Sequence, residues 1–356
     1  MPFIPRLLML PLALWAATGQ ADVVFTEFTV SQVSTTEQLD VIGVSTAQVA
    51  GVAAMPGAAD DVFALHVDTL DYESVLRIPV STGVPVKLND ATHIASDLGA
   101  PYTANFTLTG GFTYSPATDE VVLADSAHGA ANEVSLIAVD ATVGTAELVA
   151  RSANLNNLSD HAALPDGNLL VARAGDGVAG IINRADGTWT QKLTATDLLP
   201  LAPGTAALPP QVVATNIITG EAMLGAGGDG EVFKLANLNA ASPAITRLVQ
   251  PDMTGNPMAD VALDQAGNLY AYDSTANRLV IVDVRDGTTH QVPMSAITAG
   301  LGGTAPFVPT AARGLAARIA SATETDLFLA SSTSDYGVVR VRFGTAATRV
   351  NDWAVY

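Results

Sequence analysis

The stretch Asn268-Leu-Tyr-Ala-Tyr272 is a short apolar segment that opens with a polar residue directly after a turn. Five other segments have the same form: Asp61-Val-Phe-Ala-Leu65, Glu120-Val-Val-Leu-Ala124, Asn168-Leu-Leu-Val-Ala172, Glu221-Ala-Met-Leu-Gly225 and Asp326-Leu-Phe-Leu-Ala330. The first residues of the six segments are separated by 59, 48, 53, 47 and 58 positions. Self-similarity at such a period indicates one supersecondary unit that is repeated along the chain.

The unit around Asn268 contains four predicted strands joined by tight turns. They are expected at 258–263, 268–273, 278–283 and 289–293, and Gly267 supplies the positive φ that the first turn needs. Four short strands with tight turns between them form one blade of a β-propeller. Since the pattern occurs six times, we predict an all-β fold, a six-bladed β-propeller of four-stranded antiparallel blades. Residues 22–356 would form this single domain.

The run from Asp264 to Arg278 reads D-x-x-G-N-L-Y-x-x-D-x-x-x-N-R. It resembles the blade repeat of the NHL and SMP-30/gluconolactonase-like propellers, closely in this blade and in outline in the others. The resemblance implies the propeller fold. SMP-30-like lactonases also hold a divalent metal near the axis with a Glu, two Asn and an Asp. For such a set this chain offers Asp160, Asp260 and Asn216, and no Glu aligns with the family's ligand.

The two ends of the chain leave the blade count with an alternative. Two segments before the first blade, Val23–Val30 and Leu39–Ser45, are predicted strands, and Trp353–Tyr356 follows the last blade. The simplest arrangement pairs Val23–Val30 with the outside of blade six, because closed rings remove open sheet edges in this way. The strands of blade six itself are predicted at Gly314–Ala320, Asp326–Ser331, Gly337–Phe343 and Thr345–Val350. Alternatively, the end segments build a seventh blade.

Residues 1–21 are predicted to be a signal peptide. Arg6 gives a short positive region, Leu7 to Ala17 is apolar, and Gly19-Gln-Ala21 supplies the small residues that a signal peptidase reads. The apolar run is about half as long as a membrane-spanning helix. No later stretch is apolar enough to cross a membrane. We therefore expect cleavage after Ala21 and an exported protein, periplasmic or extracellular.

The composition is strongly acidic. The chain has 16 Lys and Arg against 35 Asp and Glu, a formal net charge of −19. Such a field repels nucleic acids and anionic membrane surfaces, so neither is an expected partner. The absence of cysteine excludes disulfides and thiolate chemistry. We expect a monomer whose partner is a small molecule, a glycan or a protein ligand.

One face of the predicted propeller carries the longer loops. Three connections between blades are long: Asn89–Gly110, Thr194–Gln211 and Ser295–Arg313. Long structured loops on a rigid scaffold often form a binding surface, although surface loops also tolerate drift at little cost. Four histidines (His66, His93, His128 and His161) map to this face among several aspartates. Imidazole and carboxylate together suit a divalent metal or a general acid/base pair, and structural hydrogen bonding is the competing role.

Residues that open first strands or close second strands are expected nearest the axial mouth. Those with useful chemistry are Asp160, His161, Asp260 and Arg313 in the first group, and His66, Asp125, Arg173 and Asp273 in the second. Carboxylates that converge on an axis repel one another, so they need a cation or the arginines to stay ionised. A divalent cation, Ca²⁺ or Zn²⁺, is one candidate. Alternatively, these groups cap strand ends and bind water.

Two classes of function follow. The first is an exported binding or interaction module that uses the looped face. The second is a metal-dependent hydrolase, lactonase or lyase that acts at the axial mouth on a small or sugar-derived substrate. The sequence contains no catalytic spacing such as G-x-S-x-G or H-E-x-x-H.

Overall fold

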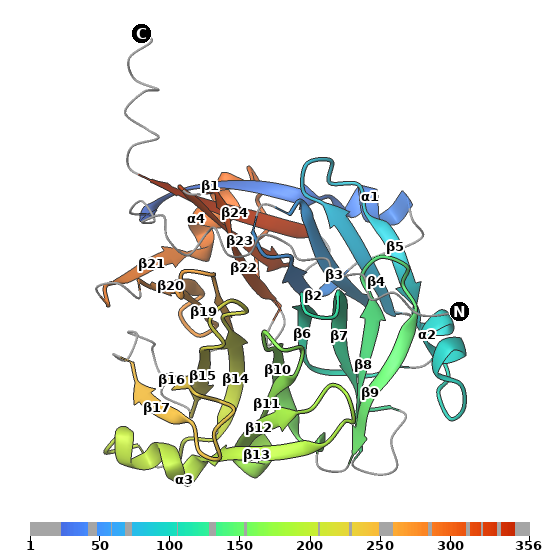
Figure 1. Ribbon diagram of the computed structural model, residues 1–356. Coiled ribbons are helices and arrows are strands. Elements are labelled where there is room, and N and C mark those ends of the chain that lie inside the picture. Colours follow the sequence, from blue (N-terminus) through green and yellow to red (C-terminus); the bar gives the residue numbers. More distant parts are fainter. Residues whose placement is uncertain are drawn as a thin grey trace.

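The computed structural model is a ring of six small antiparallel sheets around a central axis (Figure 1). Each sheet has four strands, so the predicted six-bladed β-propeller is confirmed. The structure describes residues 23–41, 48–57, 59–67, 73–104, 106–127, 133–152, 155–205, 207–227, 230–248, 259–283, 287–310, 314–321, 323–332 and 336–345.

The first five blades are each built from four consecutive strands, from the axis outwards. Blade 1 contains β2 (Gln48–Ala54), β3 (Asp61–Val67), β4 (Glu73–Pro79) and β5 (Val86–Asp90). Blade 2 contains β6 (Leu108–Ser115), β7 (Glu120–Asp125), β8 (Val134–Asp140) and β9 (Ala146–Ser152). Blade 3 contains β10 (Leu158–Ala163), β11 (Leu169–Arg173), β12 (Val178–Ile182) and β13 (Trp189–Thr194). Blade 4 contains β14 (Pro210–Thr215), β15 (Ala222–Ala226), β16 (Glu231–Ala236) and β17 (Ala244–Arg247). Blade 5 contains β18 (Asp260–Leu263), β19 (Leu269–Asp273), β20 (Arg278–Val282) and β21 (Thr289–Pro293).

Blade 6 joins the two ends of the chain. Its inner strands are β22 (Leu315–Ser321), β23 (Glu324–Ala330) and β24 (Val338–Thr345), and its outermost strand is β1 (Val23–Ser34). The pairing of β1 with β24 is antiparallel, from Val23 opposite Thr345 to Ser34 opposite Val338. The predicted closure by Val23–Val30 is therefore confirmed, with six blades and not seven. Trp353–Tyr356 lies outside the described residues.

Two predicted strands are wrong at this closure. Leu39–Ser45 was expected to be extended, but residues up to Val41 belong to the helix α1 (Thr36–Val41). A capping box starts this helix: the Thr35 backbone N–H donates to Gln38 Oε1 (2.8 Å), and the Gln38 N–H donates to Thr35 Oγ1 (3.1 Å). Thr345–Val350 was expected as the fourth strand of blade six. Thr345 instead ends β24, residues 346–350 lie outside the described part, and β1 takes the fourth place.

The second strand of each blade is buried on both faces because neighbouring sheets pack against it. All five residues of β19 are buried, as are the first six of β3. Six apolar clusters fill the spaces between adjacent blades around the ring. This double coverage explains why the six repeated segments read as nearly continuous apolar runs rather than as alternating patterns.

The polar residues that open the six repeated segments all bind a charged partner. Four of them form ion pairs and two donate to carboxylates: Asp61 with Arg77, Glu120 with Arg184, Glu221 with Lys234, Asp326 with Arg342, Asn168 with Asp166, and Asn268 with Asp264. The repeated polar position therefore marks where each second strand leaves the turn that precedes it and enters the core.

Besides α1, three helices follow blades 1, 3 and 5 and lie on the outer rim (Figure 1). They are α2 (Ala91–Leu98) after blade 1, α3 (Ala195–Leu198) with the 3₁₀ turn η4 (Leu199–Leu201) after blade 3, and α4 (Met294–Gly300) after blade 5. A further 3₁₀ turn, η3 (Ala174–Asp176), joins β11 to β12. Each rim helix inserts a buried side chain (Ile94, Leu198 or Ile297) between an odd-numbered blade and its successor. No helix in the described part of the chain is both long and apolar enough for a membrane crossing.

Candidate functional site

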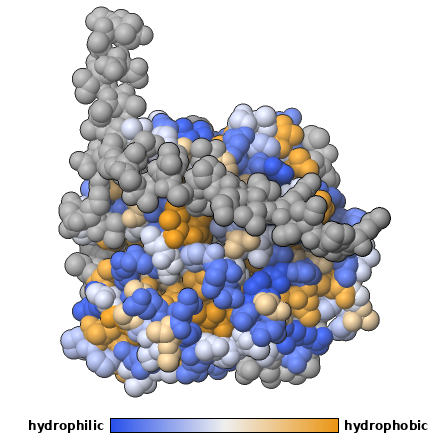
Figure 2. All heavy atoms as spheres, viewed as in Figure 1, coloured by the Kyte–Doolittle hydropathy of each residue, from blue (hydrophilic) through white to orange (hydrophobic). Residues whose placement is uncertain are grey.

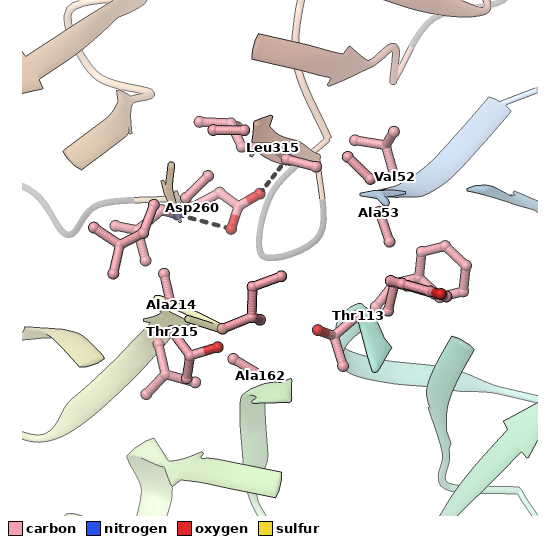
Figure 3. Close-up of a pocket in the computed structure, with 18 of the residues that line it drawn as sticks. Val52, Ala53, Thr113, Ala162, Ala214, Thr215, Asp260 and Leu315 are labelled. Atoms are coloured by element: carbon pink, nitrogen blue, oxygen red, sulfur yellow. Dashed lines mark hydrogen bonds between the residues drawn. The ribbon is translucent and has the colours of Figure 1, made fainter. Parts of the chain in front are cut away.

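The axial channel is lined by the six inner strands and is narrow. At one level it is surrounded by small side chains from equivalent register positions: Ala53, Thr113, Ala162, Ala214, Ala262 and Ala316. Figure 3 shows four of these residues, from four different strands, facing one common space. The cavity has a volume of about 100 Å³.

This volume limits what the axis can bind. A water molecule takes about 30 Å³ of liquid, and pockets for drug-sized ligands are about 300–1,000 Å³. The channel can therefore hold a few waters or a small ion, whereas a sugar ring is too large for it.

Asp160 and Asp260 occupy equivalent positions on the channel wall, in blades 3 and 5. Asp160 Oδ1 accepts from the His161 backbone N–H (2.8 Å), and its Oδ2 accepts from Val213 N–H in blade 4 (2.8 Å). Asp260 repeats the arrangement with Val261 N–H (2.8 Å) and with Leu315 N–H in blade 6 (2.7 Å). Figure 3 shows both bonds of Asp260. Each carboxylate thus joins the inner strands of two neighbouring blades.

These bonds have a structural cause. An inner strand is the edge of its sheet, so some of its N–H groups have no partner within the sheet. Asp160 and Asp260 supply acceptors to such groups and are 4% and 3% exposed. The backbone of blade 2 also closes over Asp160, because a Cβ at Gly111 would lie 2.2 Å from Asp160 Oδ1. Only glycine allows this approach.

Removal of these carboxylates should loosen the ring. We expect Asp160→Ala and Asp260→Ala each to lower the free energy of unfolding by about 2 kcal/mol, because buried N–H groups lose their acceptor. Urea unfolding monitored by tryptophan fluorescence measures the effect. Asp186→Ala is the matched control, because Asp186 also accepts from a backbone N–H but is exposed. Equal, small losses in all three variants would contradict the clamping role.

The structure does not bring Asn216 to the two aspartates. Asn216 lies four residues beyond the position in β14 that corresponds to Asp160, and four residues of strand span about 13 Å. Its side chain is engaged at that end, where Nδ2 donates to Gln265 O (3.0 Å) and Oδ1 accepts from Ile218 N–H (3.0 Å). The set of Asp160, Asp260 and Asn216 therefore does not surround one metal position. Among the described residues, no group of three or more His, Asp or Glu side chains is arranged to hold a metal ion.

The remaining predicted residues hold local structure at the looped end of the channel. His161 Nε2 lies 3.1 Å from Val122 O, and His66 is buried at the end of β3. Asp125 Oδ1 accepts from the N–H groups of Thr107 and Ala127 (2.8 and 3.0 Å).

Asp273 and Arg173 also anchor loops at this end. Asp273 accepts from two backbone N–H groups of the following loop and from Arg278 Nε (3.2 Å). Arg173 pairs with Asp176 and lies over the Trp189 ring, with Cζ 5.6 Å from the ring centroid. Arg313 and His128 lie outside the described residues.

A second hollow, of about 370 Å³, lies on the rim between blades 1 and 2. Its polar lining includes Lys87, Asp90, His93 and Asp97. Burial alone would raise the pKa of Asp90, but hydrogen bonds from His93 and Lys87 outweigh it and lower that pKa. The sequence pointed to His93 but not to the hollow. The N-cap signature at Asp90, whose side chain accepts from His93 N–H, marks the start of α2 and could have indicated the helix beside this hollow.

No protein-family model matches the chain, and no curated protein matches it. Several solved structures do match the chain. A streptogramin B lyase superimposes with a TM-score of 0.50 over 91% of this chain and 100% of its own, at 10% identity. The chain shares the β-propeller fold. Virginiamycin B lyase from Staphylococcus aureus has a TM-score of 0.50 at 11% identity, covering 88% of this chain and 99% of its own. The PQQ-bound aldose sugar dehydrogenase from Streptomyces coelicolor has a TM-score of 0.50 at 13% identity, covering 89% and 98%. At these identities the likeness concerns the fold alone.

Proposed function

We propose that this propeller is exported and acts as a binding module through its looped face, with a protein or glycan as ligand. The observation that carries the proposal is the engagement of Asp160 and Asp260. Both oxygens of each carboxylate accept backbone N–H groups in a channel of about 100 Å³. The carboxylates at the axis are therefore engaged within a narrow channel, which favours the face above it as the binding surface.

The long connections support this choice because they are anchored where they cross that face. Thr107 N–H donates to Asp125, Gly227 N–H donates to Pro209 O (3.1 Å), and Ser332 N–H donates to Val308 O (2.9 Å). Each bond joins a connection to the end of a second strand or to the loop that follows it. Anchored loops lose little conformational entropy on binding, which favours affinity.

A bulky substitution on this face should block binding. We expect Ser126→Trp and Thr275→Trp, both in loops between second and third strands, to reduce binding to glycan and peptide arrays at least tenfold. Ser242→Trp, in an exposed turn on the opposite face, is the control and should bind like the parent protein. Loss of binding only in Ser242→Trp would place the site on the face opposite the looped one.

Export is the second part of the proposal and has its own test. The order of charged, apolar and small residues in 1–21 supports cleavage after Ala21. N-terminal sequencing of the protein recovered outside the cytoplasm should begin at Asp22. A secreted chain that still begins at Met1 would contradict the proposal.

A further inference from the structure

The rim hollow between blades 1 and 2 is a built groove with fixed walls. One wall is β5 with the start of α2, and the other is the turn between β8 and β9. Gly144 of that turn approaches β5 so closely that a Cβ there would lie 2.2 Å from Leu88 O. Asn89 Nδ2 donates to Gly144 O, and Ala146 N–H donates to Asp97 Oδ2 (2.8 Å). These contacts hold both walls in place without a ligand.

Two strongly exposed apolar side chains lie at this groove, Val143 in its lining and Leu148 on β9. The described residues include five large apolar side chains that are strongly exposed, and four lie on the outer parts of blades 1 and 2: Val143 (68%), Val84 (56%), Val86 (53%) and Leu148 (41%). Glu147 pairs with Arg184 of blade 3, so the next side chain, Leu148, faces the opposite way, towards α2. The fifth, Ile218, lies on blade 4. Exposed apolar side chains beside a preformed groove favour an interaction surface, whereas single scattered ones do not.

The groove also carries an unbalanced negative charge. Lys87 Nζ lies 3.2 Å from Asp90 Oδ2, and the two charges offset each other. His93 Nδ1 is 2.7 Å from Asp90 Oδ1. Asp97 accepts the Ala146 N–H and forms no ion pair with a described residue. A carboxylate in a groove with apolar edges favours a cationic side chain with apolar neighbours.

We infer that this groove docks an extended segment of another protein in which a Lys or Arg is flanked by β-branched apolar residues. The cation would pair with Asp97, and its neighbours would cover Val143 and Leu148. β5 and β9 are the outermost strands of their sheets, so an added strand could pair with either edge. The net charge of −19 attracts a basic partner and repels a second copy of this chain. The wall that carries Val143 is a turn on the side opposite the looped face, whereas α2 at the other wall belongs to the connection 89–110.

Selection from a phage-displayed library of random 12-residue peptides tests the inference. We expect the enriched peptides to carry Lys or Arg between Val or Ile residues. A synthetic peptide of the enriched sequence, titrated by fluorescence anisotropy, should bind Asp97→Asn at least tenfold more weakly. The Val143→Ser/Leu148→Ser variant should lose similar affinity, whereas Ile218→Ser should bind like the parent. Val143, Leu148 and Ile218 are exposed, and an asparagine at position 97 can still accept the Ala146 N–H. The melting temperatures of all variants should therefore stay close to that of the parent.

Three results would overturn the inference. One is a selection with no enriched motif, and another is enriched peptides that bind all variants equally. The third is concentration-dependent dimerisation in sedimentation velocity that Val143→Ser/Leu148→Ser abolishes, because the patch would then be an interface between copies. Binding of the enriched peptide to Ser126→Trp separates this test from that of the proposed function, because only a peptide that uses the looped face should lose affinity there.

Discussion

A chain that begins at Thr35, and so lacks β1, should fail to form a stable soluble monomer. β1 is the outermost strand of blade 6 and pairs with β24 from Val23 to Ser34, with breaks in register between Val24 and Phe28 and between Gln32 and Ser34. Its Phe25 is 1% exposed and contacts Tyr270 and Phe343, with ring centroids 6.1 and 5.6 Å apart. Losing one such phenylalanine costs about 3–5 kcal/mol, and a whole domain is stable by only about 5–15 kcal/mol. The deletion also leaves β24 as an open edge that can pair with other chains.

Yield of soluble monomer by size-exclusion chromatography and thermal unfolding measure the result. The matched control is a chain that begins at Asp22, which removes the predicted signal peptide and keeps β1. Phe25→Ala separates the loss of packing from the loss of the strand, and should destabilise the propeller without aggregating it. A chain beginning at Thr35 that melts like the control would mean that β1 does not close the ring.

The blades could be predicted from the sequence because their second strands are buried on both faces. Such strands read as apolar runs bounded by turns, and six of them at similar spacing leave few alternatives to a propeller. The error at Leu39–Ser45 came from reading apolar residues as a strand when Thr35 and Gln38 form a capping box. The alternation of long and short spacings was interpreted as long loops over one face. It corresponds to the rim helices that follow blades 1, 3 and 5.

The site could not be predicted to the same extent because its bonds join residues that are far apart in the chain. Asp160 looked like a ligand because a carboxylate near an axis needs a partner. That partner is the backbone N–H of Val213, 53 residues away, and no local pattern marks it. Arg173 and Asp273 likewise bind the loops beside them. Sequence shows which residues have useful chemistry, but packing between blades decides which of them is still available for a ligand.

Asp326→Asn should be among the most destabilising single substitutions in the propeller. Asp326 is fully buried, and it accepts from Arg342 Nε (2.6 Å) and Nη2 (2.9 Å), while Arg318 Nη2 lies 3.5 Å away. Arg318 is only 4% exposed, with its guanidinium carbon 5.0 Å from the Phe328 ring centroid. Burial lowers the pKa of Arg318, and Asp326 opposes that shift. Breaking a buried ion pair by removing one partner costs about 3–5 kcal/mol, because the other charge stays buried without compensation.

The corresponding position in blade 1 provides the control. Asp61 pairs with Arg77 at 2.5 Å, but the Arg77 side chain is 38% exposed. Water can therefore solvate Arg77 after Asp61→Asn, and the loss should be about 1 kcal/mol. Urea unfolding of both variants compares the two sites directly.

A double substitution identifies the source of the loss. If the uncompensated charge of Arg318 causes it, Asp326→Asn combined with Arg318→Met should cost less than the sum of the single changes, because the methionine removes that charge and keeps much of the volume. Additive losses would instead assign the effect to the hydrogen bonds between Asp326 and Arg342. Equal losses in Asp326→Asn and Asp61→Asn would show that burial of the arginine does not matter, and the argument from Arg318 would then fail.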